Sequence, residues 1–232
     1  MKKIFLFSLL LFIFINENKA QIGISIHAGS SVFNTQRISP KINVQDKLSV
    51  SPFVGLIFSK KLNNQFEIET ELQYVQRGNY FLQLHTECFS TEVYGKASYF
   101  VIQPKISYIV SDWISLRSGL DFGFKTSEKY YYSSFILDQI KADDNSSYYK
   151  INALNSLDFG ASIGIVFKLD KINASIIYSR SLISTLKQPY KNEEFSYYSD
   201  KNTKYFNQSL QIGLEIPFFT FKKNKFIVKS IF

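Results

Sequence analysis

The stretch Gln65 to Gly78, QFEIETELQYVQRG, decides how the rest of the chain is interpreted. Its residues divide by parity into an apolar set and a polar set. The first set is Phe66, Ile68, Thr70, Leu72 and Tyr74, and the second is Glu67, Glu69, Glu71, Gln73 and Arg77. A β-strand sends alternate side chains to opposite faces. The stretch therefore predicts a strand with one apolar face and one face that carries a column of carboxylates.

The first twenty residues have the layout of a secretory signal peptide. Lys2 and Lys3 precede an apolar run over residues 4–15, and a polar stretch ends at Ala20. We expect cleavage after Ala20, which makes Gln21 the first residue of the mature protein. The apolar run is shorter than the roughly 20 residues that a membrane-spanning helix needs, and no later run reaches that length.

The composition favours strands and excludes several functional classes. Aromatic residues make up 17% of the chain, and aromatic and β-branched residues favour strands. Cys88 is the only cysteine, so an internal disulfide is impossible, and its position excludes a lipid-modified cysteine at the mature terminus. The formal net charge of +8 is spread along the chain. Without a basic stripe, this charge does not indicate nucleic-acid binding.

Alternation with a period of two recurs along the mature chain and predicts eight strands in all, with no amphipathic helix. The other predicted strands cover residues 22–29, 49–58, 97–110, 113–125, 156–168, 172–182 and 206–218. Pro104 lies in the middle of one of them and has no backbone N–H to donate. We therefore expect a bulge or a local gap in strand pairing there.

The connections between these strands alternate between long and short. The long polar ones cover residues 34–46, 79–95, 126–152 and 184–204, and the short ones 60–64, 111–112 and 169–171. Outer-membrane barrels combine an even strand number, short periplasmic turns and long outer loops, and closure removes exposed sheet edges. The sequence therefore predicts an all-β fold, an eight-stranded antiparallel up-and-down transmembrane β-barrel over residues 21–221, with both termini in the periplasm. A basic, aromatic tail follows over residues 222–232.

The last predicted strand carries a second sign of an outer-membrane protein. It has a polar residue, a glycine, and then apolar residues at the positions Gln211, Gly213, Ile216 and Phe218. This pattern resembles the terminal β-signal that is read by the outer-membrane barrel insertion machinery.

Several segments also carry a family resemblance. They are ELQYVQRG (Glu71 to Gly78), YFVIQPKISY (Tyr99 to Tyr108), SLDFGASIGIVFKL (Ser156 to Leu169) and the last strand. Together they resemble the outer-membrane β-barrel domain family that includes PorT, which is common in Bacteroidetes. The resemblance implies an outer-membrane barrel and, for most members, no defined activity, whereas PorT itself is associated with protein secretion. Similar proteins tend to have a glycine after the pair that corresponds to Tyr178 and Ser179, where this chain has Arg180.

If the apolar faces contact lipid, the polar faces point into the barrel. The charged residues that we then expect in the lumen are Glu67, Glu69, Glu71, Arg77, Lys105, Arg117, Asp121, Lys125, Asp158 and Lys168. An eight-stranded barrel is just wide enough for side chains to fill it, and unpaired buried charge is very costly. The simplest interpretation is a salt-bridged plug, and a path for protons or cations is the alternative.

Other candidate sites are weaker. His85 and Cys88 have the spacing of two metal ligands but lack a third and fourth, and the group Asp143, Asp144 and Asn145 lacks the spaced ligands of a calcium loop. The chain has no glycine-rich phosphate loop, nucleophile elbow or paired cysteine motif. We therefore predict no catalytic residues, no metal site and no cofactor.

Aromatic residues gather near the predicted short turns. They are Phe58, Phe66, Tyr108, Trp113, Phe167, Phe218 and Phe219. An aromatic girdle lies at this level in a membrane barrel.

These observations predict a non-enzymatic outer-membrane protein that acts through its extracellular loops or its periplasmic end, with an accessory role in protein secretion as one form. The partners we expect are outer-membrane lipid, the insertion machinery and an unidentified protein. A narrow solute or ion channel is one alternative. The other is a soluble lipocalin-like barrel with its apolar faces inward around a ligand, because periodicity alone leaves the facing of the strands open.

Overall fold

The computed structural model describes residues 22–38, 48–85, 89–136, 155–184, 204–222 and 225–228. The predicted signal peptide, residues 1–20, lies outside these ranges. The strands are β1 (Ile22–Ile38), β2 (Ser49–Lys61), β3 (Phe66–His85), β4 (Phe89–Ser111), β5 (Ile114–Ile136), β6 (Leu157–Lys168), β7 (Asn173–Ser181), β8 (Lys204–Lys222) and β9 (Lys225–Val228). Across the described ranges there is no helix long and apolar enough to span a membrane.

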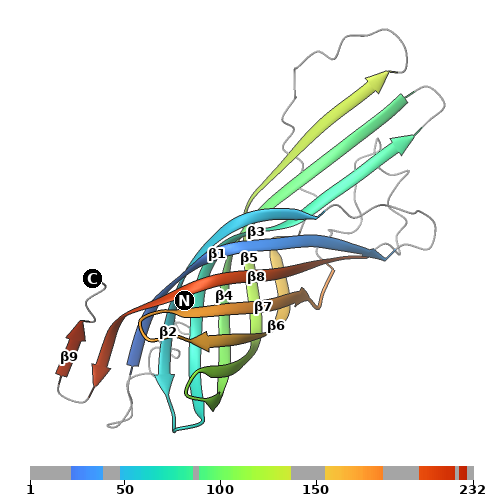
Figure 1. Ribbon diagram of the computed structural model, residues 1–232. Helices are drawn as coiled ribbons and strands as arrows, with labels where there is room; N and C mark the ends of the chain where they lie inside the picture. Colours follow the sequence, from blue (N-terminus) through green and yellow to red (C-terminus); the bar gives the residue numbers. More distant parts are fainter. Residues whose placement is uncertain are drawn as a thin grey trace, which may run out of the picture.

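The strands form one antiparallel sheet in which sequence neighbours pair, and β1 also pairs with β8. That last pairing runs from Ile22 opposite Phe221 to Ile38 opposite Lys204. It closes β1 to β8 into the predicted eight-stranded up-and-down barrel (Figure 1). The short strand β9 lies within the predicted tail and, among the described strands, pairs with the end of β8 alone, from Phe219 to Lys222.

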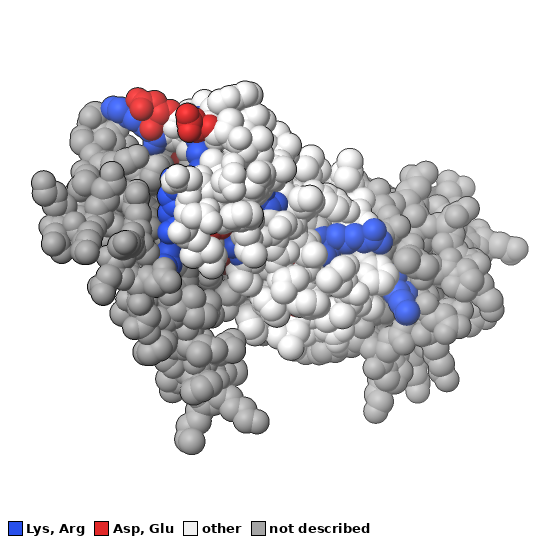
Figure 2. Space-filling model, turned by 90° about the horizontal axis from the view of Figure 1, so that it is seen from below, with Lys and Arg blue, Asp and Glu red and all other residues white. Residues whose placement is uncertain are grey.

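The facing of the strands follows the parity of their side chains. Ile163 and Leu214 are 63% and 50% exposed on the outer wall, whereas Glu71 and Gln73 in the lumen are 0% exposed. Figure 2 shows that the described outer surface is mostly uncharged in its middle and that charged side chains gather toward the ends. An apolar outer wall suits lipid. The lipocalin-like alternative, with apolar faces inward, is therefore wrong.

Three strands continue well beyond the closed barrel. β3 pairs with β4 as far as His85 opposite Ser90, and β4 pairs with β5 as far as Phe89 opposite Ile136. Figure 1 shows this three-stranded extension projecting from the long-loop end. The prediction of loops over 79–85, 89–95 and 126–136 was wrong, as it was for 34–38, which belong to β1. Outside a membrane both faces of a sheet meet water, so the alternation that identifies a barrel strand fades there.

Two β-bulges mark the point where the extension leaves the barrel. The β3–β4 register shifts between Arg77 and Asn79, and the β4–β5 register shifts between Ser98 and Tyr99, which skips Thr126. Thr126 Oγ1 donates a hydrogen bond to the Ser98 carbonyl at 3.1 Å. Bulges bend a sheet and are common at barrel rims, so this pair redirects the three strands away from the barrel wall.

The pairing of β4 also bears out the expectation for Pro104. Towards β3, Pro104 lies opposite Thr70 in an unbroken ladder. Towards β5, the ladder passes from Ile102 directly to Lys105, so Gln103 and Pro104 are skipped. The gap lies on the side where the missing proline donor is needed.

Aromatic side chains line the outer wall near the short turns. The rings of Phe66 and Tyr108 lie 5.3 Å apart, those of Phe218 and Phe219 lie 4.6 Å apart, and Trp113 is exposed beside the β4–β5 turn.

Candidate functional site

The lumen nearest the short turns is crossed by one arginine held between two glutamates. Arg117 on β5 places Nε 2.8 Å from Glu69 Oε2 of β3 and donates from Nη1 to Glu215 Oε1 of β8 at 2.5 Å. Ser107 donates to the other Glu69 oxygen at 2.5 Å. Glu69, Arg117 and Glu215, here called the Arg117 layer, are all buried. The layer links three separate strands across the barrel.

A second layer, centred on Glu71, lies deeper in the barrel. Lys105 Nζ donates to Glu71 Oε2 at 2.5 Å, and His27 Nδ1 lies 2.7 Å from Glu71 Oε1. Gln73 donates to Glu71 at 3.2 Å and exchanges hydrogen bonds with Gln211 of β8 at 3.2 and 3.1 Å. Glu71, Lys105 and His27, here called the Glu71 layer, therefore bind together β3, β4 and β1. Buried charges are tolerated when they are paired and hydrogen-bonded in this way.

Towards the long loops, two buried aspartates have different kinds of partner. Asp121 accepts from Arg77 at 3.0 Å and from Gln103 at 2.9 Å. Asp158 accepts from neutral groups, Ser181 at 2.5 Å and Asn207 at 3.0 Å. Lys125 forms an ion pair with Glu128 close to the rim.

Glycines on the lumenal face provide the space that these layers occupy. A Cβ at Gly213 would lie 2.5 Å from His27 Nε2 and 2.8 Å from the Phe53 ring, and one at Gly55 would lie 2.8 Å from Glu71 Oε1. Real Cβ atoms essentially never approach so closely. A side chain at either position would force the Glu71 layer or its neighbours to shift.

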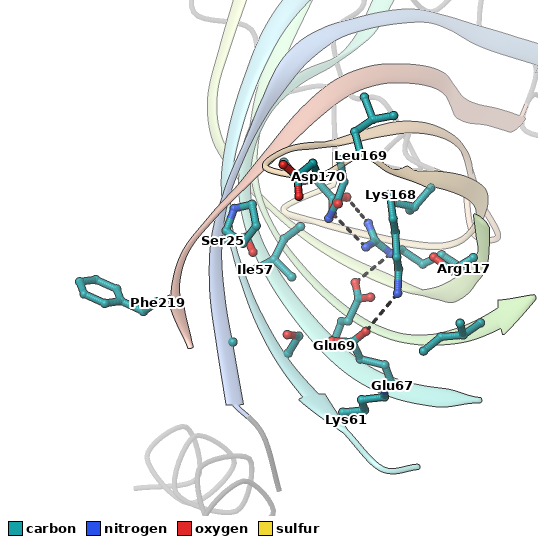
Figure 3. A pocket seen from close by; sticks show the side chains of 18 residues that line it. Ser25, Ile57, Lys61, Glu67, Glu69, Arg117, Lys168, Leu169, Asp170 and Phe219 are labelled. Carbon is teal, nitrogen blue, oxygen red and sulfur yellow. Dashed lines mark hydrogen bonds and ion pairs between the residues drawn. The ribbon is translucent and has the colours of Figure 1, made fainter. Parts of the chain in front are cut away.

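A cavity of about 330 Å³ opens at the short-turn end, with the Arg117 layer as its floor (Figure 3). Its mouth is lined by Lys61 and Glu67 near the β2–β3 turn and by Lys168 and Asp170 near the β6–β7 turn. Lys168 Nζ and Glu67 Oε2 are 4.0 Å apart and partly exposed. The ion pair at the mouth is thus much looser than those beneath it.

The structure places every predicted lumenal residue on the inner side of the barrel. Glu69, Glu71, Arg77, Lys105, Arg117, Asp121 and Asp158 are buried there. Glu67 and Lys168 lie at the cavity mouth, and Lys125 lies near the opposite rim. Three of their ionisable partners, His27, Glu215 and Glu128, were not among the predicted lumenal residues. Parity was the available signal, because His27 shares a strand face with Ser25 and Ser31, and Glu215 shares one with Gln211.

Ser175, His27 and Glu71 have the order of a serine, histidine and acid triad. His27 Nε2 lies 2.8 Å from Ser175 Oγ, and its Nδ1 faces Glu71. A nucleophile must reach its substrate, yet the Ser175 side chain is only 1% exposed and is not part of the cavity lining. The Ser175 hydroxyl is therefore not reached from the cavity, and its contact with His27 links β7 to β1.

The residues of the predicted insertion signal divide between the two faces of β8. Gln211 and Gly213 face the lumen and are buried, whereas Ile216 and Phe218 are half-buried. β8 continues past them to Lys222.

The side chains of the weaker metal candidates lie outside the described part of the chain. They belong to His85 and Cys88 and to the group Asp143, Asp144 and Asn145. Within the described residues, no three His, Cys, Asp or Glu side chains are grouped to hold a metal ion.

Comparison with solved structures finds similarity to several outer-membrane proteins. Ail, the attachment invasion locus protein of Yersinia pestis, is 13% identical, with a TM-score of 0.42 over 85% of this chain and 99% of that chain. Neisserial surface protein A is 9% identical, with a TM-score of 0.43 over 85% and 99%. OprG from Pseudomonas aeruginosa is 12% identical, with a TM-score of 0.43 over 86% and 97%. No curated protein matches.

A family model gives the assignment. The model for the outer membrane protein beta-barrel domain matches residues 16–187, which is more than half of the chain. The protein therefore belongs to the outer membrane protein beta-barrel domain family and is located in the outer membrane.

Proposed function

We propose that this protein is a non-enzymatic outer-membrane barrel that binds partners at its two ends and does not conduct solutes. The observation that carries the proposal is the pair of ionic layers across the lumen. Arg117 reaches from β5 to carboxylates on β3 and β8, and Glu71 holds both Lys105 and His27. A solute that crossed the barrel would have to separate both sets of contacts.

The energetics favour a closed lumen. Leaving one partner of a buried ion pair alone costs about 3–5 kcal/mol. Opening the Arg117 layer separates one guanidinium from two carboxylates at once, so its open form is rarely populated at equilibrium. Binding is then left to the surfaces outside the closed barrel, where loops and strand ends on a rigid scaffold commonly carry function.

Conductance in planar lipid bilayers tests this proposal. We expect no steady conductance from the wild type. Removal of both layers in the double variant Arg117→Ala and Glu71→Ala should produce discrete openings, whereas the matched rim variant Lys168→Ala should stay silent. Steady openings of the wild type would instead support the narrow channel.

We further propose that the short-turn end faces the periplasm and serves protein secretion as an accessory surface. Two observations support this role: the resemblance of several segments to the family that includes PorT, and the open, charged cavity at that end. Deletion of the gene should reduce secreted protein in the culture medium, and the variant Lys168→Ala with Asp170→Ala should reproduce the loss. Unchanged secretion in the deletion strain would exclude this role.

The partners that bring the barrel to its place are outer-membrane lipid and the barrel insertion machinery. The outer wall, mostly uncharged in its middle, supports the first (Figure 2). The half-buried Ile216 and Phe218 support the second, because they remain available for recognition on the last barrel strand. We expect Phe218→Ala to slow insertion in an assembly assay and to leave the unfolding midpoint of the inserted protein nearly unchanged.

A further inference from the structure

The three-stranded extension has an unpaired backbone edge along β3. β2 pairs with β3 only from Lys61 opposite Glu67 to Phe53 opposite Val75. Earlier residues of β2, from Ser49 to Pro52, pair with β1 alone. β3 itself continues to His85 with β4 on its other side. Beyond the ladder, the Gln76 carbonyl still accepts from Ser51 Oγ of β2 at 3.3 Å. Within the described ranges, no strand pairs with the β2-facing side of residues 79–85.

Hydrogen bonds near the start of β3 show which residues face this edge. Ile109 N donates to the Gln65 carbonyl at 2.7 Å, and the Phe66 carbonyl accepts from Leu62 N at 2.9 Å on the β2 side. Alternate residues of an antiparallel strand bond to opposite neighbours, so odd residues face β4 up to Arg77. The bulge at Gly78 reverses this order. Beyond it, Asn79, Phe81 and Gln83 direct their N–H and C=O groups to the open edge.

The sequence of this edge lacks the usual protection against strand addition. Natural edges carry charged residues, especially Lys, or Pro. Residues 78–84, GNYFLQL, contain neither a charge nor a proline. The opposite edge of the extension, on β5, contains Lys125, Glu128 and Lys129, and β2 carries Pro52 where it separates from β3. The β3 edge is therefore uncharged from the bulge onward, where the extension leaves the barrel, whereas the β5 edge carries charge there and becomes uncharged only over residues 130–136.

The geometry of a membrane protein indicates which strand could add to this edge. Two copies in one bilayer are related by a rotation about the membrane normal, so β3 runs in the same direction along that normal in both copies. Their β3 edges could cross or run parallel but could not form an antiparallel ladder. In the parallel arrangement, N–H groups would face N–H groups and carbonyls would face carbonyls. A strand from a different protein has no such constraint.

We propose that the β3 edge of the extension, residues 79–85, is a docking site for an extended, largely uncharged segment of another protein, which adds to the sheet as an extra strand. Main-chain hydrogen bonds supply the affinity in this mode of recognition. The inference rests on the proposed function, because it assigns one of the two binding ends and its class of partner.

The test uses the full-length protein in lipid nanodiscs and a phage-displayed library of random peptides of about ten residues, which is the length of a long strand. Selected peptides are titrated against the wild type, Gln83→Pro and Gln83→Ala. Proline removes the edge-facing donor at Gln83 but no bond to β4, whereas alanine removes the side chain and keeps the donor. A heat-dependent shift in SDS gel mobility shows that each variant is folded.

We expect peptides that bind the wild type to lose at least about tenfold in affinity on Gln83→Pro, which corresponds to roughly one or two net hydrogen bonds. Affinity for Gln83→Ala should stay within about threefold, as for a surface substitution. Equal losses on both variants, no loss on either, or no selectable peptide would each overturn the docking site. If this test fails but the wild type does not conduct in planar bilayers, only the β3 docking site is rejected. If the wild type conducts, the proposed function itself is rejected.

Discussion

One strand, β3, crosses two different environments. From Phe66 to Arg77 it is part of the closed barrel, with Glu69 and Glu71 buried in the lumen and Tyr74 on the outer wall. From Asn79 to His85 it belongs to the extension and pairs only with β4 among the described strands. The bulge at Gly78 separates the two parts.

The difference shows what the alternating pattern reports. Inside the membrane one face of a strand contacts lipid and the other a packed polar lumen, so apolar residues are favoured on the first face and polar residues on the second. Beyond the bulge no such contrast exists, and backbone pairing alone defines the strand. Charge in the first part is bound by specific partners, whereas the second part offers free backbone groups. Four substitutions test this contrast, in order of decreasing effect.

The substitution Glu71→Leu should have the largest effect. It leaves Lys105 and His27 in the lumen without their shared carboxylate, and a buried pair broken in this way costs about 3–5 kcal/mol. Urea unfolding in detergent, followed by the fluorescence of the single tryptophan, Trp113, measures the loss. Glu71→Gln keeps the shape and some hydrogen bonds and should lose less. A loss below about 1 kcal/mol for Glu71→Leu would mean that the lumen solvates its charges as water does.

A charge on the lipid-facing wall should come next. Ile163 is 63% exposed near the middle of β6, and a lysine at the bilayer midplane of a barrel costs about 2–4 kcal/mol. The matched substitution in the extension, Leu82→Lys, should stay within about 0.5 kcal/mol if that part of β3 lies outside the membrane, as for a surface substitution. Unfolding from lipid vesicles compares the two directly. Similar losses at both positions would contradict the division of β3 into a membrane part and an aqueous part.

Gly213→Ala should cost about 1–3 kcal/mol, the usual range for overpacking. The added Cβ would approach His27 Nε2 and the Phe53 ring too closely. The same measurement on Gly78→Ala, at the bulge between the two parts of β3, gives the comparison. If Gly213→Ala slows insertion while stability is unchanged, this glycine serves the insertion signal rather than the packing of the lumen.

The smallest effect is expected at the cavity mouth. Glu67 and Lys168 are partly exposed and 4.0 Å apart, and such pairs contribute about 0–1 kcal/mol. Glu67→Gln should therefore change stability by less than about 1 kcal/mol, and added salt should reduce the difference further. A loss as large as that of Glu71→Leu would show that the mouth is sealed as tightly as the layers beneath it.

The barrel could be predicted from the sequence because every strand that crosses the membrane alternates between apolar residues facing lipid and polar residues facing the lumen. Glu69 and Glu71 could be assigned to the lumen from their neighbours alone. Their partners could not, because contacts such as Arg117 with Glu215 span 98 positions and depend on the tilt and stagger of the closed barrel. The extension could not be predicted for the opposite reason. Residues 79–85 pair through their backbone, and their two faces do not differ in environment, so the sequence shows no alternation of apolar and polar residues.

Accessibility of a lumenal cysteine tests the closed lumen most directly. In a Cys88→Ser background, Gln73→Cys places a thiol at a position that is 0% exposed in the lumen, and Asp112→Cys places one on an exposed short turn. Labelling with a water-soluble maleimide in nanodiscs, read by mass spectrometry, compares their rates. We expect rapid labelling of Asp112→Cys and none of Gln73→Cys until the barrel is unfolded in urea. Equal labelling rates at the two positions in the folded protein would contradict the closed lumen.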